Sequence, residues 1–254
     1  MNFKELHEGP HILILPNAWD AVSARIVVNA GAKAVATSSA AVAWAHGYAD
    51  GNALPVPLLL ATLRDITRVV NVPVTADIEA GYSDDPDDVG KTVRALLDAG
   101  VAGINLEDGG GSPDLLCAKI EAARRAGPIF INARTDMFLR KQDNALDESI
   151  ARAKRYTDAG ADGIFVPGVT DAAQIETIVR SIALPLNVMA RPGVPPAAEL
   201  QRIGVRRLSG AAWLARAALK SLHDTAAEFL AHGDSDALAA KATPIADYNG
   251  MFSG

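Results

Sequence analysis

Eight short apolar segments, separated by helix-forming stretches, constrain the fold more than any other feature of this sequence. Four of them follow a proline and four follow a glycine, and the two kinds alternate strictly along the chain. Proline suits the start of a strand because it has no N–H to donate, and glycine suits the left-handed residue that closes a helix. The segments begin, in chain order, at His11, Ala34, Val74, Gly103, Ile129, Gly163, Leu186 and Arg206. This alternation predicts eight strand-and-helix units.

The stretches between these segments have apolar residues at helical spacing along one face, and several begin with Asp or Ser-Pro, as helices commonly do. The clearest of them are residues 87–99, 115–126, 147–159 and 171–181. Short apolar strands that alternate with helices indicate a parallel sheet covered on both faces. Eight such units in 254 residues therefore predict an α/β fold, a (β/α)8 TIM barrel.

Two other organisations fit a chain of this length, namely a pair of small domains and a doubly wound open sheet. A doubly wound sheet normally has a glycine-rich phosphate turn after its first strand, and here that strand ends in Pro16-Asn-Ala-Trp-Asp20. We expect one domain over residues 1–254, with the barrel in about residues 1–215 and a helical tail in residues 216–254. The tail ends in an apolar, aromatic segment that can cover its own barrel or contact a neighbouring subunit.

Charge and composition exclude several classes of protein. The net charge is −6 and no run of Lys or Arg forms a basic face, which argues against binding to nucleic acid or to an anionic membrane. No stretch of 18 apolar residues occurs and the N-terminus has no signal-like apolar region, so we expect a cytoplasmic protein. The single cysteine, Cys117, excludes an internal disulfide and a zinc site built from several cysteines.

Polar side chains follow the second to fifth predicted strands, at the end of the barrel where active sites of this fold lie. Carboxylates that converge from adjacent strands repel one another unless a cation lies among them. Oxygen ligands without His or Cys favour Mg2+ or Mn2+ over Zn2+, so the sequence predicts a magnesium site here. The strand ends and their loops carry Thr37-Ser-Ser39, His46, Tyr48, Asp50, Asp77-Ile-Glu79, Glu107-Asp108 and Asn132-Ala-Arg134-Thr-Asp136.

Arg134 adds a planar fork that matches a carboxylate or a phosphonate. A cation beside such a fork suits a small 2-oxo carboxylate, because the metal can stabilise the enolate oxygen as it gains charge. Simpler interpretations exist: Arg134 can be an ion-pair partner of the acids, and His46 is only a weak candidate for proton transfer. Lone acids after a strand are commonly helix caps, and to that role we assign Asp84, Asp85, Asp87 and Asp88.

Five segments of the chain resemble, in order and in spacing, the isocitrate lyase / phosphoenolpyruvate mutase superfamily. They are residues 17–25, 37–39, 76–82, 100–108 and 131–136, and they extend from the first predicted strand to the fifth. Each segment is short, but the ordered set is specific. The resemblance implies a TIM barrel that assembles as a homo-oligomer, typically a tetramer in which the last helix is exchanged between neighbours.

The resemblance also implies how the metal is held. Asp77 would be the direct Mg2+ ligand, and Glu79, Glu107 and Asp50 would hold metal-bound waters. Of these, Glu107 and Asp50 are expected to take part in catalysis together with Arg134.

For the substrate, the resemblance implies a second set of residues. The backbone at Ser38 and Ser39 would bind the carboxylate or oxo group. Trp19 and Asp20 would shape the mouth of the site, and Arg134 would grip the far end of the substrate.

Departures from the superfamily narrow the expected activity. The lyases have a cysteine loop soon after the fourth strand, where this chain has Gly109-Gly-Gly-Ser-Pro-Asp114. Cys117 falls within the following helix, where we expect it to be buried. The Lys and Asn of the mutase gating loop are also missing, and on the seventh strand Asn187 is the one expected substrate contact.

Together these features predict a Mg2+-dependent lyase that cleaves a C–C bond of a small 2-oxo acid, by decarboxylation or hydrolysis of an oxaloacetate-like substrate. The alternatives are cleavage of a phosphonate P–C bond and a barrel that binds a 2-oxo acid without turnover. A Schiff-base aldolase would need a lysine at a strand end, and no predicted strand end has one. A phosphate-binding barrel is a further alternative, because Ser209-Gly-Ala-Ala follows the eighth strand.

Overall fold

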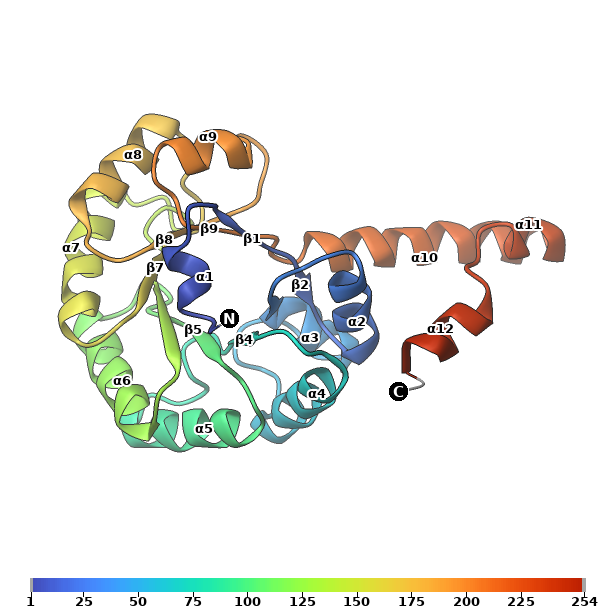
Figure 1. Ribbon diagram of the computed structural model, residues 1–254, viewed down its shortest axis with the longest axis horizontal. Coiled ribbons are helices and arrows are strands. Elements are labelled where there is room, and N and C mark those ends of the chain that lie inside the picture. The colour runs from blue at the N-terminus through green and yellow to red at the C-terminus, as the bar shows by residue number, and fades with distance from the viewer. Residues whose placement is uncertain (1, 253–254) are drawn as a thin grey trace.

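The computed structural model describes residues 2–252 and shows a barrel of parallel strands surrounded by helices (Figure 1). The strands hydrogen-bond in the order β1-β9-β8-β7-β6-β5-β4-β3-β2. The predicted TIM barrel is therefore confirmed. The strands are β1 (Leu13–Leu15), β2 (Asn17–Ala18), β3 (Val35–Thr37), β4 (Val74–Asp77), β5 (Gly103–Glu107), β6 (Phe130–Arg134), β7 (Gly163–Phe165), β8 (Leu186–Met189) and β9 (Arg207–Ser209).

The first predicted strand consists of two pieces, because Pro16 has no N–H and interrupts the ladder. On one side of Pro16, β1 pairs with β9, and on the other side β2 pairs with β3. This change of partner closes the barrel, since the two pieces are consecutive in the chain. The other strands begin within two residues of their predicted starts.

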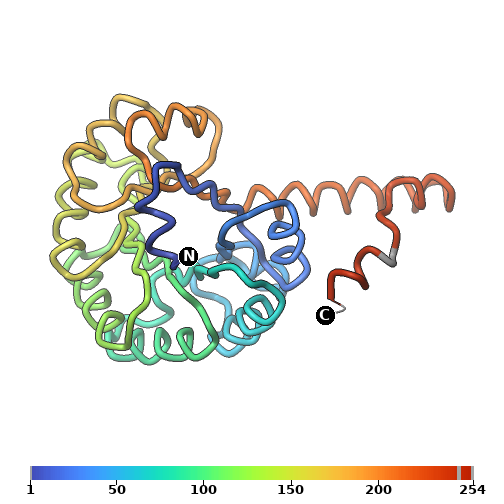
Figure 2. Tube along the Cα trace, viewed as in Figure 1, coloured from blue at the N-terminus to red at the C-terminus, as the bar shows by residue number. Residues whose placement is uncertain are grey.

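The four clearest helix predictions are confirmed to within two residues at each end, and the path of the chain through them can be followed in Figure 2. Asp85 and Asp171 cap two of these helices, as expected of acids at helix starts. The helices of the barrel are α1 (Glu5–Glu8), α2 (Ala21–Asn29), α3 (Ser39–Ala45), α4 (Val56–Val69), α5 (Pro86–Asp98), α6 (Pro113–Ala126), α7 (Ala145–Asp158), α8 (Ala172–Ser181) and α9 (Ala197–Arg202).

The helical tail leaves the barrel as one long helix, α10 (Trp213–His232), and continues through α11 (Ser235–Ala239) and α12 (Ile245–Phe252) (Figures 1 and 2). Gly250, Met251 and Phe252 return to the flank of the barrel, where they line a cleft with Val70. Because Val70 precedes β4, this cleft lies toward the N-terminal ends of the strands. The tail is thus not a lid over the opposite end of its own barrel. None of the helices between residues 2 and 252 is long and apolar enough to cross a membrane.

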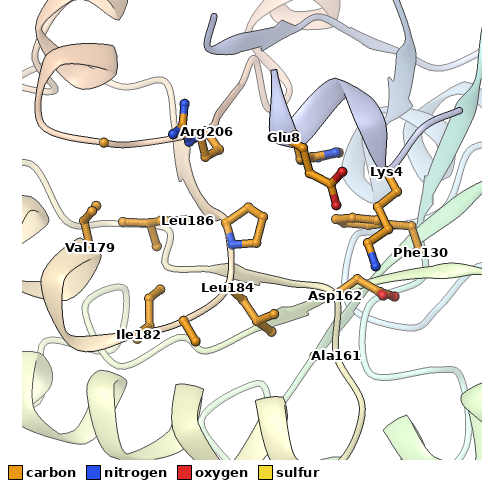
Figure 3. A pocket seen from close by; sticks show the side chains of 14 residues that line it. Lys4, Glu8, Phe130, Ala161, Asp162, Val179, Ile182, Leu184, Leu186 and Arg206 are labelled. Atoms are coloured by element: carbon orange, nitrogen blue, oxygen red, sulfur yellow. The ribbon is translucent and has the colours of Figure 1, made fainter. Parts of the chain in front are cut away.

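Residues at the start of the chain close the N-terminal end of the barrel. Phe3 packs edge-on against Phe130, and the His7 ring stacks on Phe130 with the ring centroids 4.3 Å apart. A Cβ on Gly103 would lie 2.7 Å from the Phe3 ring, so this close approach requires glycine. A cavity of about 610 Å³ opens beside these aromatic rings, and its lining includes Lys4, Glu8, Phe130, Asp162 and Arg206 (Figure 3). It lies at the end of the barrel opposite the predicted active site.

Because the His7 ring is buried, we expect the stability of the folded protein to depend on pH. Burial lowers the pKa of His7 from 6.5 to about 4, with the charge of Arg207 acting in the same direction. Below pH 6.5 the unfolded chain therefore binds a proton that the folded protein does not, and stability is lost as the pH falls toward 4. Relative to His7→Gln, the wild type should lose up to about 3 kcal/mol across this range, measured by urea unfolding at a series of pH values. Parallel curves for the two proteins would contradict this expectation.

Candidate active site

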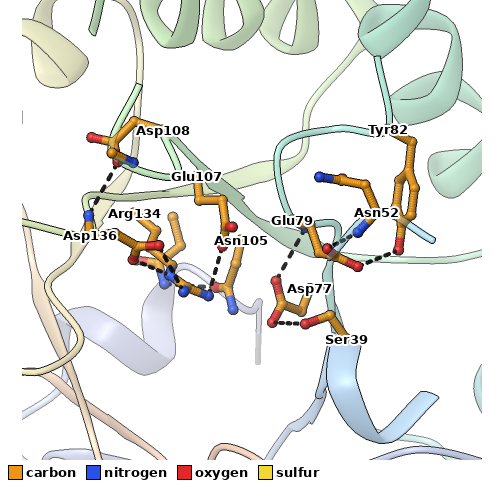
Figure 4. A network of polar contacts seen from close by, with 12 residues as sticks. Ser39, Asn52, Asp77, Glu79, Tyr82, Asn105, Glu107, Asp108, Arg134 and Asp136 are labelled. Carbon is orange, nitrogen blue, oxygen red and sulfur yellow. Dashed lines mark hydrogen bonds and ion pairs between the residues drawn. The ribbon is translucent and has the colours of Figure 1, made fainter. Parts of the chain in front are cut away.

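Three charged side chains from adjacent strands meet at the C-terminal end of the barrel, as the sequence predicts (Figure 4). Asp77 ends β4, Glu107 ends β5 and Arg134 ends β6. The register places Asp77 beside Asn105 and Glu107 beside Arg134. All of these side chains are buried or half-buried, so their charges interact through little water.

Asp77 is held in place by the end of the neighbouring strand β3. Its Oδ2 accepts a hydrogen bond from the Ser39 hydroxyl at 3.1 Å, and its backbone N–H donates to the Thr37 hydroxyl at 3.0 Å. The structure therefore brings together Ser39, an expected substrate contact, and Asp77, the expected metal ligand. Ser38, the next expected contact, uses its hydroxyl to cap α3 by accepting from the Ala41 N–H.

Glu79 lies on the same side of the site, in a backbone conformation with φ of 51° that is uncommon for a residue with a side chain. One of its oxygens accepts a hydrogen bond from the Asn52 N–H, and the other accepts from the Tyr82 hydroxyl at 3.3 Å. Burial raises the pKa of Glu79, and the charges of Asp50 and Asp77 raise it further against the opposing effect of the Asn52 hydrogen bond. The loop after α3, which carries Asp50, is thus tied to the acid cluster.

Arg134 forms ion pairs with two acids on either side of it. Its Nη1 lies 2.7 Å from Glu107 Oε2, and its Nε and Nη2 donate to the two oxygens of Asp136 at 2.7 and 3.0 Å. Burial lowers the pKa of Arg134, but Glu107 and Asp136 outweigh it and raise the pKa overall. Burial raises the pKa of Glu107, together with the charges of Asp77 and Asp136, while Arg134 opposes the rise. All three donor nitrogens of the fork are therefore engaged with protein carboxylates.

Asp108 anchors the short loop that follows β5, a role that the sequence pattern did not predict. Its buried carboxylate accepts hydrogen bonds from Arg152 Nη1 at 2.9 Å and from the Tyr156 hydroxyl at 2.7 Å. It also accepts from the backbone N–H groups of Gly110 and Asp136. The available signal was the spacing of Arg152 and Tyr156, which places both on one face of α7.

The remaining expected residues lie around this cluster or below it. Asp20 accepts from the Ser23 N–H at 2.7 Å as the N-cap of α2, and Trp19 precedes it with its backbone N–H bound to the Ser23 hydroxyl. Asn187 points into the barrel interior, where its Oδ1 accepts from the Ser209 hydroxyl at 3.1 Å.

Two residues with reactive side chains, His46 and Cys117, make contacts that do not point to a role in catalysis. His46 forms a hydrogen bond with the Thr62 hydroxyl at 2.8 Å, which directs its ring toward α4. Cys117 lies in α6 as expected, but it is half-buried rather than buried, and its thiol contacts the Arg155 carbonyl.

The acid cluster fits a hard divalent cation that keeps most of its water. Among residues 2–252, no three His, Cys, Asp or Glu side chains form a ready-made metal cage. Mg2+ binds through one or two carboxylates and retains several waters, so it does not need such a cage. Asp77 offers carboxylate oxygens next to Glu79 and Glu107, and these oxygens are the ligands that Mg2+ prefers in proteins.

Comparison with known proteins identifies the family. The chain matches the family described as phosphoenolpyruvate phosphomutase over residues 3–230. The chain belongs to this family. It is an enzyme of the lyase and mutase type, in agreement with relatives that are named as 2-methylisocitrate lyases and oxaloacetate decarboxylases.

The chain is also similar to individual proteins and to a solved structure. The chain is 37% identical to an uncharacterized protein of Mycobacterium tuberculosis, over 82% of this chain and 81% of that protein. It is 30% identical to the oxaloacetate decarboxylase of Pseudomonas aeruginosa, over 87% of this chain and 82% of the enzyme. The crystal structure of 2,3-dimethylmalate lyase is 25% identical and superposes with a TM-score of 0.86, covering 98% of this chain and 93% of that one.

The anchoring role of Asp108 predicts a large loss of stability when its carboxylate is removed. Asp108→Ala removes one of the two carboxylates that pair with the buried Arg152, the other being Glu148, and it leaves the Tyr156 hydroxyl without its acceptor. The substitution should therefore cost about 3 kcal/mol of unfolding free energy. Asp114→Ala is the matched control, because Asp114 is 82% exposed and also pairs with an arginine of α7. That variant should change stability by less than about 1 kcal/mol in the same urea titration. Equal effects of the two substitutions would show that Asp108 is not an anchor.

Proposed function

We propose that this enzyme cleaves a C–C bond of a small 2-oxo carboxylate, such as an oxaloacetate-like acid, with Mg2+ bound through Asp77. The observation that carries the proposal is the convergence of Asp77, Glu79 and Glu107 at one end of the barrel beside Arg134. Asp77 would hold the ion, and a divalent cation there would supply stabilisation of the negative charge that develops on a 2-oxo acid when the bond breaks. Mn2+ has the same ligand preference and should replace it.

The side chains of this chain would prepare the site for that chemistry. The Ser39 hydroxyl donates to Oδ2 of Asp77 and the Glu79 N–H donates to Oδ1, so groups of the protein fix the orientation of this carboxylate. Glu79 and Glu107 would receive hydrogen bonds from metal-bound water, and Asp50 would do so from the loop after α3. Burial and the nearby acids raise the pKa of Tyr82, so its hydroxyl keeps its proton and donates a hydrogen bond to Glu79.

Substrate would enter between the acid cluster and the neighbouring strand ends. Ser38 and Ser39 would bind its carboxylate or oxo group through their backbone, with Trp19 and Asp20 at the mouth. Arg134 would stabilise the far end of the substrate, after exchanging part of its contact with Glu107 or Asp136. Phe165 lies 5.7 Å from the Arg134 guanidinium and gives that side of the site an apolar wall.

A lysine-based mechanism receives no support from the site. Lys119 is buried near the end of β4, but its ammonium donates to the Ala80 carbonyl at 2.8 Å and lies 3.6 Å from Asp84. These contacts tie the nitrogen to the backbone and to an acid, whereas a Schiff base requires an amine that is free to attack the substrate.

The decisive measurement is turnover of a panel of 2-oxo acids with and without Mg2+. We expect pyruvate release from an oxaloacetate-like acid that depends on Mg2+ and falls at least about 1000-fold in Asp77→Ala and in Arg134→Ala. Asp84→Ala is the control, because Asp84 is 96% exposed at the start of α5, and it should keep full activity. Phosphonopyruvate belongs in the panel, since exclusive turnover of that acid would establish P–C cleavage instead. Mg2+-dependent turnover that survives Asp77→Ala would overturn the assignment of the metal site.

We also propose that the tail in residues 216–254 packs on a neighbouring subunit, in a dimer or a tetramer. Only Ala215 of α10 is buried, whereas apolar side chains along the rest of that helix are exposed. An apolar groove of about 920 Å³ lies on the barrel where α10 departs, and Ile14 of β1 is 59% exposed in it. Exposed apolar patches of this kind mark interfaces. The exposed apolar residues of α10 are Trp213, Leu214, Leu219, Leu222, Phe229 and Leu230.

Light scattering coupled to size-exclusion chromatography tests this assembly. The wild type should elute as a dimer or tetramer, and Leu219→Glu combined with Leu222→Glu should shift it toward the monomer. Lys91→Glu is the charge-changing control, because that side chain is 77% exposed on α5, which lies on a different part of the barrel from α10 (Figure 1). A monomeric wild type would contradict the proposal.

A further inference from the structure

The interior of the barrel below the acid cluster contains a network of polar side chains that the proposed mechanism does not use. Asn105 Oδ1 accepts hydrogen bonds from Asn132 Nδ2 at 2.8 Å and from Arg207 Nη2 at 3.2 Å. Arg207 Nε donates to the Ser209 hydroxyl at 3.0 Å, and that hydroxyl contacts Asn187 Oδ1 at 3.1 Å. The network therefore links β5, β6, β8 and β9 across the barrel.

Two donors in this network have no hydrogen-bond partner among the described residues. They are Nη1 of Arg207 and Nδ2 of Asn187, and the two side chains are 0% and 1% exposed. The strand register pairs Asn187 directly with Arg207, so both donors come from neighbouring positions. A buried donor without an acceptor is costly, and native proteins keep one mainly where a ligand or water accepts from it.

The charge on Arg207 is equally unexplained by the protein itself. Within residues 2–252 no carboxylate forms an ion pair with it, and its two hydrogen-bond partners are neutral oxygens. Burial lowers its pKa to about 9, which reports the cost of keeping this cation in the interior. An apolar side chain of similar size would fill the same space without that cost, so stability alone does not account for an arginine here.

The position of Arg207 connects it to the active site. Asn105, which binds its guanidinium, is paired in register with the metal-binding Asp77. The charge of Asp77 acts on Arg207 and partly offsets the effect of burial on its pKa, and the charge of Arg207 also acts on His7 at the opposite end, so its guanidinium lies between the two ends of the barrel. Arg134, the other arginine of the site, has all three of its nitrogens engaged with Glu107 and Asp136. Arg207 differs in that one whole nitrogen of its guanidinium, Nη1, has no partner among the described residues.

We propose that Arg207 Nη1 and Asn187 Nδ2 together bind one carboxylate oxygen of the substrate at the floor of the active site. The pair consists of donors only and carries one positive charge, so it selects an anionic oxygen. Its depth inside the barrel restricts it to small, planar acids, of which a short 2-oxo carboxylate is one. This inference rests on the proposed function, because it assigns a binding residue to the same substrate.

Binding of oxalate, a planar dianion that is not turned over, tests the pair directly. Calorimetry with the Mn2+-loaded full-length enzyme should show oxalate affinity reduced about tenfold or more in Arg207→Met and in Asn187→Ala, the size expected for a hydrogen bond to a charged group. Arg207→Lys keeps the charge and should recover part of the loss. Arg206→Met is the matched control, because Arg206 is the neighbouring residue but lines the cavity at the opposite end of the barrel.

Two further readouts separate this role from a structural one. Affinity for Mn2+ alone should stay within about twofold in all four variants, since none of the substituted residues contacts the metal site directly. A crystal structure of the wild type with Mn2+ and oxalate should place an oxalate oxygen within hydrogen-bond distance of Arg207 Nη1. This structure also decides the matter if Arg207→Met does not fold.

The outcomes are distinct. Unchanged oxalate affinity in folded Arg207→Met, or an ordered water at Nη1 beside bound oxalate, would overturn the inference while leaving the proposed function intact. A parallel loss of Mn2+ affinity would also overturn it, because Arg207 would then serve the metal site. If the wild type neither binds oxalate nor turns over any 2-oxo acid, the proposed function itself fails.

Discussion

Crowding of negative charge at one end of the barrel is the constraint on which the rest of the site depends. Asp77, Glu79, Glu107 and Asp136 come from three consecutive strand ends, where little water screens them. Each carboxylate has a fixed donor: a serine hydroxyl, a backbone N–H and a tyrosine hydroxyl, or the guanidinium of Arg134. These donors hold the oxygens in place without removing the excess of negative charge. A divalent cation is the simplest further compensation.

The fold could be predicted from the sequence because its signals are local. A proline before a strand and a glycine after a helix act within two or three residues, and eight repetitions of them leave few topologies open. Gly31, Gly100, Gly160 and Gly204 all have the positive φ that this reading requires. The predicted strands also place the acids of the site, since the C-terminal ends of adjacent parallel strands must lie side by side.

Other parts of the site could not be predicted because they depend on contacts between residues far apart in the chain. Asp108 is stabilised by Arg152, 44 residues later, and Glu79 receives a backbone N–H from Asn52, 27 residues earlier. Arg207 looked like an ordinary strand residue, and only the closed barrel brings it to Asn105, 102 residues away. Periodicity shows which way a side chain points, but not what it meets there.

The barrel interior changes in polarity from one end to the other, and this gradient relates stability to function. Phe3, Phe130 and Leu13 form an apolar cluster at the N-terminal end, which Phe3 and its short helix seal. Above them, asparagines and a buried arginine replace the branched apolar residues that usually fill such a barrel. Each polar layer forgoes hydrophobic stabilisation and must satisfy its own hydrogen bonds. Apolar residues at these positions would make the barrel more stable. The polar centre is therefore better explained by the ligand that we propose to bind above it.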